Sequence, residues 1–163
     1  MKREVKGRLL KVVGKSSLLT RSLKFLYGKY VAPQYSIGVY AAICETHNGE
    51  LRVLVQKQWD GGMSLPGGHV EYSDISLEEA AKREVLEETG LIVEIGKMLE
   101  MYKNKNSLTV LFPAQITGGE LAVGDESIGF EWVSIRDLSG EWVDGKVGRN
   151  SQMFSMFQRA LKK

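Results

Sequence analysis

The sequence predicts one mixed α/β domain of the α+β kind, in which a β-sheet packs with at least two helices. Alternating or continuously apolar runs indicate several short strands. A capped segment over residues 77–89 and an apolar-striped segment over residues 150–161 indicate two helices. With 163 residues, the chain has room for one domain with a sizeable core, whereas a second complete domain would be cramped.

Residues 1–34 are predicted to form an N-terminal extension, and residues 35–163 the domain proper. Within the extension, residues 8–13 are a candidate strand, and residues 16–27 carry leucines and aromatics loosely at helical spacing. We expect this apolar stripe to pack against the body of the protein or against a partner subunit, which leaves a homodimer open. Basic residues also gather here, and we expect a solvated basic face, with an anion-binding or membrane-surface role as the alternative.

The strand pattern is clearest after Pro33. Residues 36–45 and 51–57 are apolar or alternating runs joined by the sequence HNGE. Asn-Gly is the preferred centre of a tight hairpin turn, because both positions need positive φ. Further strands are expected at residues 91–95, 108–116 and 130–133.

Composition and charge exclude several classes of protein. The chain is 43% apolar and 26% charged, which is ordinary for a soluble globular protein, and its net charge of +2 is too small to indicate nucleic-acid binding. We expect no specific DNA binding, since no helix-turn-helix segment is present. We also expect neither a membrane span nor a signal peptide. The single cysteine, Cys44, cannot form an internal disulfide, so a reducing compartment and a cytoplasmic location are expected.

The helix over residues 77–89 has marked ends. Ser76 followed by Glu79 is a capping box, in which the serine oxygen accepts from the backbone and the glutamate reaches back. Gly90 suits the position just past the helix end, where a left-handed conformation is usual.

One face of this helix gathers three carboxylates, those of Glu84, Glu87 and Glu88. Like charges three and four residues apart, together with the unfavourable helix dipole, cost roughly 1–3 kcal/mol. A bound divalent cation would reverse the sign of that cost. The alternative is a solvated helix stabilised by pairs such as Glu79–Arg83 and Glu78–Lys82.

The glycine-rich segment before the helix favours the metal site. Pro66-Gly67-Gly68 lets the backbone approach the acidic face, so that a main-chain carbonyl can join the carboxylates. Ligation by oxygen alone, with room for water, suits Mg²⁺ or Mn²⁺ and does not suit zinc.

Residues 68–91, GHVEYSDISLEEAAKREVLEETGL, resemble the Nudix box. That pattern is Gly, five residues, Glu, seven residues, Arg-Glu, an apolar residue, any residue, Glu-Glu, any residue, Gly and an apolar residue. Residues 83–91 match at every position, and the preceding LPGGHVE is similar to the family's approach to the box. The resemblance covers about residues 36–140 and implies a Nudix-type fold, a mixed β-sheet packed between helices.

The first acidic position of the box departs from the pattern. Counting from Gly68, it falls on Asp74, and eight residues instead of seven separate it from Arg83. The loop therefore carries a one-residue insertion, and aspartate replaces glutamate. In the family that acid mainly supports the loop, so the departure bears on loop geometry and metal stoichiometry and does not bear on catalytic capacity.

The resemblance implies Mg²⁺-dependent hydrolysis of a phosphoanhydride bond in a nucleoside diphosphate linked to another moiety, for example a nucleoside triphosphate, ADP-ribose or a nucleotide sugar. It also implies roles for the acidic face: Glu84, Glu87 and Glu88 would hold the metal with the Gly67 carbonyl, and Arg83 would orient a glutamate. The alternative is a non-catalytic Nudix-fold module that senses a nucleotide or binds a protein.

A general base is also needed, and the resemblance leaves two candidates. One is a glutamate of the box, Glu84. The other is Glu126, which lies six residues before Trp132, as an acid does in the family; a solvated loop acid is the alternative for this residue. Weaker candidates for contact with the substrate are Lys57, Arg52 and His69.

Overall fold

The computed structural model describes residues 21–22, 25–26, 28, 34–59, 61–103, 105–123, 127–138 and 151–161. The contacts of the chain divide it into two units, Met1–Gln34 and Tyr35–Lys163. In the first unit, residues 21–22, 25–26 and 28 are helical, and the candidate strand over residues 8–13 lies outside the described residues. In the described part of the chain, no helix is long and apolar enough to cross a membrane.

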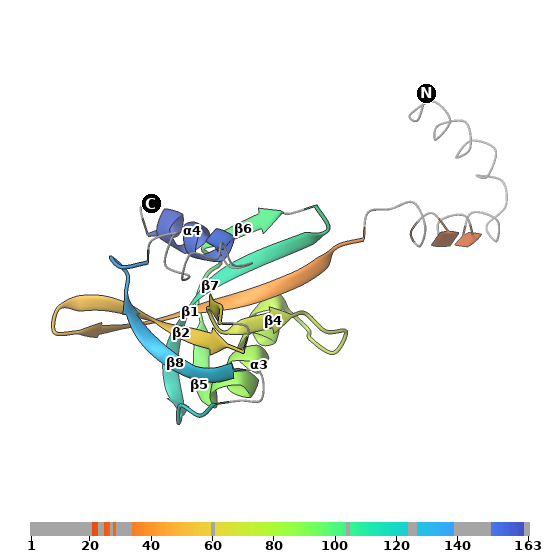
Figure 1. Cartoon of the computed structure of the whole chain (residues 1–163). Helices are drawn as coiled ribbons and strands as arrows, with labels where there is room; N and C mark the ends of the chain where they lie inside the picture. The colour runs from red at the N-terminus through yellow and green to blue at the C-terminus, as the bar shows by residue number, and fades with distance from the viewer. Residues whose placement is uncertain are drawn as a thin grey trace. The chain divides into compact units, whose positions relative to one another are not determined.

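The described residues of the second unit form a mixed sheet of eight strands and two helices (Figure 1). The strands are β1 (Ser36–His47), β2 (Glu50–Gln58), β3 (Met63–Ser64), β4 (Gly67–His69), β5 (Leu91–Ile95), β6 (Glu100–Lys103), β7 (Ser107–Gly119) and β8 (Ser127–Ser134). The helices are α3 (Leu77–Thr89) and α4 (Ser151–Ala160). Strands β3-β2-β1-β7-β5 lie in that order, with β4 on β1, β6 on β7 and β8 on β2. Only the central pair, β1 with β7, is parallel among the described pairings.

The hairpin between β1 and β2 is confirmed. Asn48 and Gly49 have φ angles of 52° and 80°, as the turn type predicted from Asn-Gly requires. Next to the turn, His47 pairs with Glu50, and the two strands continue antiparallel. The two residues of the turn thus set the register between β1 and β2.

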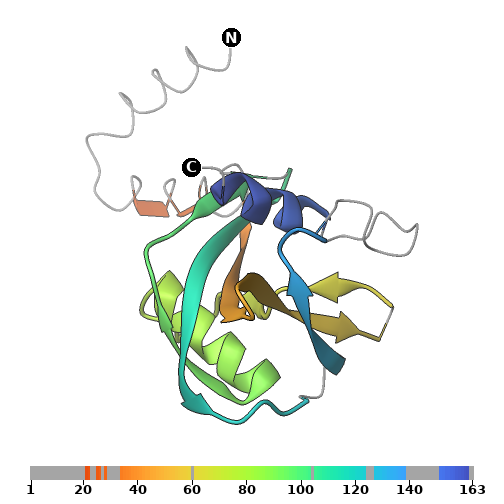
Figure 2. The ribbon, with the colours of Figure 1, turned by 90° about the vertical axis from the view of Figure 1, so that its left-hand side faces the viewer.

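The sheet is packed between the two helices (Figure 2). On β1, Ala41 and Ile43 pack with Val85 of α3, whereas Ala42 packs in the cluster that holds Phe157 of α4. Successive side chains of a strand point to opposite faces, so one strand supplies both cores. The predicted α+β class, a mixed sheet packed between helices, is confirmed.

Three strands were not predicted, namely β3, β4 and β6. Each has two to four residues, which is too short for an alternating pattern to be recognised. Strands β7 and β8 were predicted but extend beyond the predicted bounds of 108–116 and 130–133. Helix α4 agrees with the predicted segment, and Arg159 ties it to β6 through hydrogen bonds of 2.9 and 2.8 Å from Nε and Nη2 to Glu100 Oε1.

Candidate active site

Helix α3 begins and ends as the sequence predicts. Ser76 Oγ accepts a hydrogen bond from the Glu79 backbone at 3.1 Å, and Gly90 closes the helix with φ of 71°. The buried face is made of Ala80, Ala81, Val85 and Thr89. The carboxylates of the acidic face therefore lie at the margin of the packed surface and outside the core.

Two glycines, Gly67 and Gly68, allow the main chain to approach the carboxylates of helix α3 closely. The N–H of Gly67 donates to Glu88 Oε2 at 2.7 Å. Gly67 has φ of 146°, and a Cβ atom there would overlap the Val39 carbonyl oxygen. A Cβ at Gly68 would lie 2.5 Å from Glu84 Oε2. Both positions must therefore be glycine if two carboxylates are to touch the backbone here.

Arg83 joins the loop before the helix to the acidic face. Its Nε and Nη2 donate to the two oxygens of Asp74, each at 3.1 Å, in a bidentate pair. Its Nη1 donates to Glu84 Oε1 and to Glu87 Oε2, each at 3.0 Å. The fifth bond runs from Nη2 to the carbonyl of His69 at 3.0 Å. All five donors of the guanidinium are thus engaged.

Asp74 occupies the first acidic position of the box in spite of the altered spacing. Its side chain is only 6% exposed, and Oδ2 also accepts from the Glu71 backbone at 2.7 Å. The hydrogen bonds from Arg83, and then the one from Glu71, hold the pKa of Asp74 below its usual range, so the carboxylate stays charged at neutral pH. The additional residue is accommodated next to it, where Ile75 is 91% exposed.

We expect deletion of Ile75 to be tolerated far better than deletion of Leu77. Removing Ile75 restores the seven-residue spacing and takes no side chain from the core. Removing Leu77 shortens the helix and rotates every later helical residue by about 100°, which displaces Glu84 and Glu88 from the glycines. Thermal unfolding and turnover of the two deletion variants test this. Equal damage from both would show that the loop needs its additional residue.

Helix α3 does not have the ion pairs proposed for a solvated helix. The pairs Glu79–Arg83 and Glu78–Lys82, which that alternative required, are not formed. Lys82 Nζ lies 3.4 Å from Glu79 and 3.8 Å from Glu94 on β5, because its side chain leans along the helix toward the neighbouring strand. Arg83 turns away toward Asp74, whose bidentate geometry and low exposure make it the better partner.

The cluster keeps a surplus of negative charge. Asp74, Glu84 and Glu87 contact the single guanidinium of Arg83, and Glu88 adds a fourth carboxylate. Burial, followed by the charges of Glu88 and Glu84, raises the pKa of the nearby Tyr40. The cluster is therefore a place where a cation would be stabilised.

The donors fit a hard divalent cation, since all of them are oxygens. Among the described residues, however, no three His, Cys, Asp or Glu side chains are grouped closely enough to hold a metal ion. The Gly67 N–H is hydrogen-bonded to Glu88, and Arg83 is hydrogen-bonded to Glu84 and Glu87. Glu87 is 58% exposed, so it has room to turn from Arg83 toward a cation beside Glu84 and Glu88.

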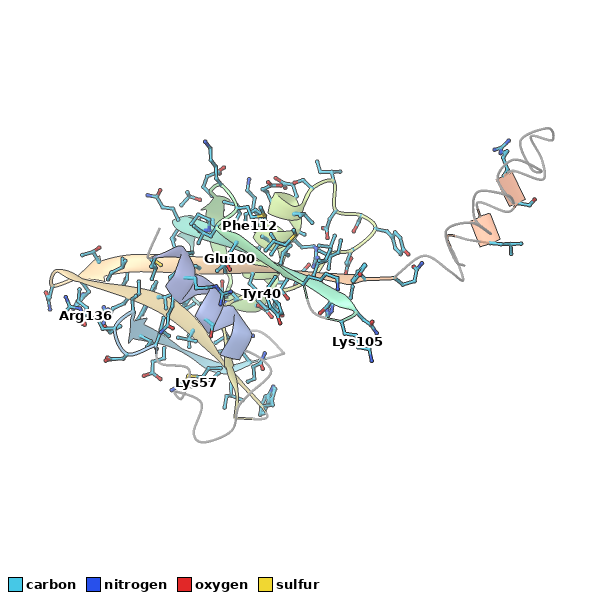
Figure 3. All side chains as sticks on the ribbon, turned by 90° about the horizontal axis from the view of Figure 1, so that it is seen from above. Tyr40, Lys57, Glu100, Lys105, Phe112 and Arg136 are labelled. Atoms are coloured by element: carbon cyan, nitrogen blue, oxygen red, sulfur yellow. The ribbon has the colours of Figure 1, made fainter. Side chains whose placement is uncertain are left out.

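The other predicted residues lie apart from this cluster, except His69. Lys57 Nζ lies 2.8 Å from Glu131 on β8, and Figure 3 shows it away from Tyr40, which lies near the middle of the domain. Arg52 Nη2 lies 2.6 Å from Glu45 in the β1–β2 hairpin. His69 is exposed, and its carbonyl contacts Arg83. Glu126 lies outside the described residues.

One polar residue was not singled out from the sequence. Gln56 on β2 is 1% exposed, although it carries a carboxamide. The signal that would have found it is a polar residue inside the apolar run of β2.

Comparison with known proteins identifies the class. Residues 35–154 match the family profile described as NUDIX domain, so the chain belongs to the Nudix family and is a Nudix hydrolase. This family acts on nucleoside diphosphate derivatives, and its members generally use divalent metal ions.

Two curated relatives are similar over most of the domain. An ADP-ribose pyrophosphatase of Methanocaldococcus jannaschii is 30% identical over 131 residues, which are 76% of this chain and 75% of that protein. A putative 8-oxo-dGTP diphosphatase of Bacillus subtilis is 36% identical over 104 residues, which are 61% of this chain and 67% of that protein.

Solved structures share the fold at lower identity. An ADP-ribose pyrophosphatase from Streptococcus suis has a TM-score of 0.60 at 24% identity, covering 78% of this chain and 92% of that one. The NUDIX domain of Shewanella oneidensis NrtR, complexed with ADP ribose, has a TM-score of 0.60 at 21% identity, covering 83% of this chain and 96% of that one.

Proposed function

We propose that the protein hydrolyses the phosphoanhydride bond of a nucleoside diphosphate linked to another moiety, in a reaction that depends on Mg²⁺ and accepts Mn²⁺ as a substitute. ADP-ribose is the first candidate substrate, and water would cleave it to AMP and ribose 5-phosphate. The observation that carries the proposal is the contact of Glu84 and Glu88 with the two glycines, beside a guanidinium that leaves the cluster negatively charged.

The residues of the cluster are assigned different roles in this reaction. Glu84, Glu87 and Glu88, with the carbonyl of Gly67, would hold the metal ion, which when bound neutralises phosphate charge and activates water. Arg83 positions Glu84 and Glu87 and fixes the loop through Asp74. A general base, Glu126 or Glu84, would take the proton from the attacking water.

A curated relative favours ADP-ribose as the first substrate to test. The Methanocaldococcus jannaschii relative is named for it and covers three quarters of this chain. A nucleoside triphosphate is the second candidate, because the Bacillus subtilis relative, named as a putative 8-oxo-dGTP diphosphatase, has the higher identity over a shorter span.

The remaining assignments follow from the same reasoning. We assign catalysis to residues 35–163 and treat residues 1–34 as an N-terminal extension. Cys44 is half-buried, and burial raises its pKa to about 11, as expected for an unreactive thiol that serves packing. This is compatible with the reducing cytoplasm as the location, where the enzyme would act as a monomer or a homodimer.

A substrate panel tests the proposal. The protein is incubated with ADP-ribose, a nucleotide sugar, a nucleoside triphosphate and 8-oxo-dGTP, each with Mg²⁺, with Mn²⁺ and with a chelator. We expect metal-dependent release of a nucleoside monophosphate, fastest from ADP-ribose. Nucleotide binding without turnover of any compound by either metal would overturn the proposal and support the non-catalytic sensing module.

A further inference from the structure

Two buried polar atoms on one end of the sheet are without a hydrogen-bond partner among the described residues. They are Oε1 of Gln56, a residue 1% exposed, and Oγ of Ser127, a residue 2% exposed. In the described part of the chain, two further buried atoms are without a hydrogen-bond partner, Nε of Arg52 and Oε2 of Glu100. The charged groups of these two residues already form ion pairs. Unpaired buried polar groups weaken folding, so these two call for an explanation.

Gln56 faces the same side of the sheet as helix α3. Leu54, two residues earlier on β2, packs in a cluster with Val85 of α3, and alternate side chains of a strand share a face. Across the neighbouring strands, Gln56 pairs with Ser64 on β3 and with Phe130 on β8. Phe130 packs against the same cluster as Leu54.

Three more polar residues surround Gln56 and complete a polar patch. Gln58 Nε2 donates to Ser64 Oγ at 3.4 Å, and Gln58 pairs with Ser127 next to a bulge in the β2–β8 ladder. We call Gln56, Gln58, Ser64 and Ser127 the polar patch. It interrupts an otherwise apolar face, and it is bordered by the aromatic ring of Phe130.

The polar patch lies close to the acidic cluster along the chain. Ser64 precedes Gly67 by three residues, and the Gly67 N–H is bonded to Glu88. Three residues span at most about 11 Å, even when fully extended. A substrate whose phosphates lie at the acidic cluster would therefore bring the remainder of its nucleotide within reach of the patch.

The chemistry of a carboxamide fits adenine in particular. A glutamine presents an acceptor and a donor side by side, and adenine presents the N6 amino donor beside the N7 acceptor, so the two pair in a bidentate way. Hypoxanthine and guanine present two acceptors at the same edge, which leaves the carboxamide oxygen of Gln56 facing another acceptor. The ring of Phe130 supplies an apolar surface for the flat base.

We propose that Gln56 is a specificity-determining residue that recognises the adenine base of the substrate through its N6 and N7 positions. The inference rests on the proposed function, because it assumes that a nucleotide binds with its phosphates at the acidic cluster. It adds the identity of the base, which the cluster itself does not determine.

A ligand series on the unmodified protein gives the first test. Calorimetry in the presence of Mg²⁺ compares AMP with IMP, in which a carbonyl replaces the N6 amino group, and with 7-deaza-AMP, which lacks the N7 acceptor. We expect each change to weaken binding by about tenfold or more, as the loss of a bidentate contact requires. Equal affinities for the three ligands would overturn the inference, and this test does not depend on the folding of any variant.

A matched pair of variants gives the second test. Gln56→Met keeps length and shape but removes both hydrogen-bonding atoms, and Gln115→Met makes the same change at an exposed position of β7. In Gln56→Met we expect the preference of kcat/KM for ADP-ribose over its hypoxanthine analogue to fall from about tenfold or more to near unity. The Gln115→Met variant should keep the preference.

These experiments distinguish failure of the inference about Gln56 from failure of the proposed function. A folded Gln56→Met variant that keeps the wild-type preference overturns the inference and leaves the proposed function standing. Absence of turnover of both ADP-ribose and its hypoxanthine analogue by the unmodified protein overturns the proposed function. The ratio of AMP to IMP affinity in Gln56→Met then decides the inference by itself.

Discussion

Glu88→Gln and Glu84→Gln are each expected to lower kcat by at least about 10³-fold while leaving the fold intact. Glutamine keeps the length of the side chain and an acceptor oxygen, so the 2.7 Å bond from Gly67 to residue 88 can persist. What is lost is the negative charge that would hold a divalent cation. The measurement is the steady-state rate with ADP-ribose over a titration of Mg²⁺, beside thermal unfolding of each variant.

The same helix supplies the control for this prediction. Glu78→Gln changes an exposed carboxylate in the first turn of the helix and should leave the rate near that of the unmodified protein. If both site variants keep more than roughly a tenth of the wild-type rate, the assignment of the metal site to this cluster is wrong.

Glu126→Gln is expected to lower kcat by about 10²–10⁴-fold, with little effect on the affinity for Mg²⁺. The reason is the spacing of Glu126 from Trp132, which resembles the arrangement of the loop base in the family. A purely solvated acid would cost almost nothing on substitution. Rates and Mg²⁺ affinity are measured together, since a fall in metal affinity would make the residue a ligand in place of a base.

Neighbouring acids serve as controls for Glu126. Glu131 forms a partly exposed pair with Lys57 at 2.8 Å, and such pairs contribute little, so Glu131→Gln should be mild. Asp125→Asn should be mild as well. Damage from Glu131→Gln would mean that the base has been misassigned by a shift of the loop alignment. Mild effects at all three positions would move the role to Glu84 on α3.

The parts of the fold that the sequence predicted correctly depend on neighbours along the chain. The turn at Asn48 and Gly49 requires two residues in sequence, and the ends of α3 require Ser76 and Gly90 at a fixed distance. These contacts span a few residues, so a pattern of spacing contains all the information that they need. The boundaries of α3 were therefore predicted to the residue.

The parts that could not be predicted depend on contacts between distant segments. Strands β3 and β4 exist because they pair with β2 and β1, and their own residues carry no recognisable alternation. In the same way, the sequence did not predict that Arg83 forms a bidentate pair with Asp74 in the loop before the helix. Only the path of the loop brings that carboxylate to the guanidinium.

The candidate site combines both kinds of information. Spacing placed Glu84, Glu87 and Glu88 on one face, and the glycines next to them. The structure adds that the face is at the margin of the core and that Glu88 is bonded to Gly67. The burial of Gln56 depends on its partners on β3 and β8. A polar residue in an apolar run could be noticed in the sequence, but its burial could not be predicted from the sequence alone.

The complete engagement of Arg83 has a consequence for the order in which ligands bind. With all five donors given to Asp74, Glu84, Glu87 and His69, the guanidinium has none left for a phosphate oxygen. A diphosphate approaching alone would meet carboxylates and be repelled. We therefore expect the cation to be needed for substrate affinity as well as for chemistry. Metal and substrate should then bind with positive cooperativity, and each should raise the affinity for the other by the same factor.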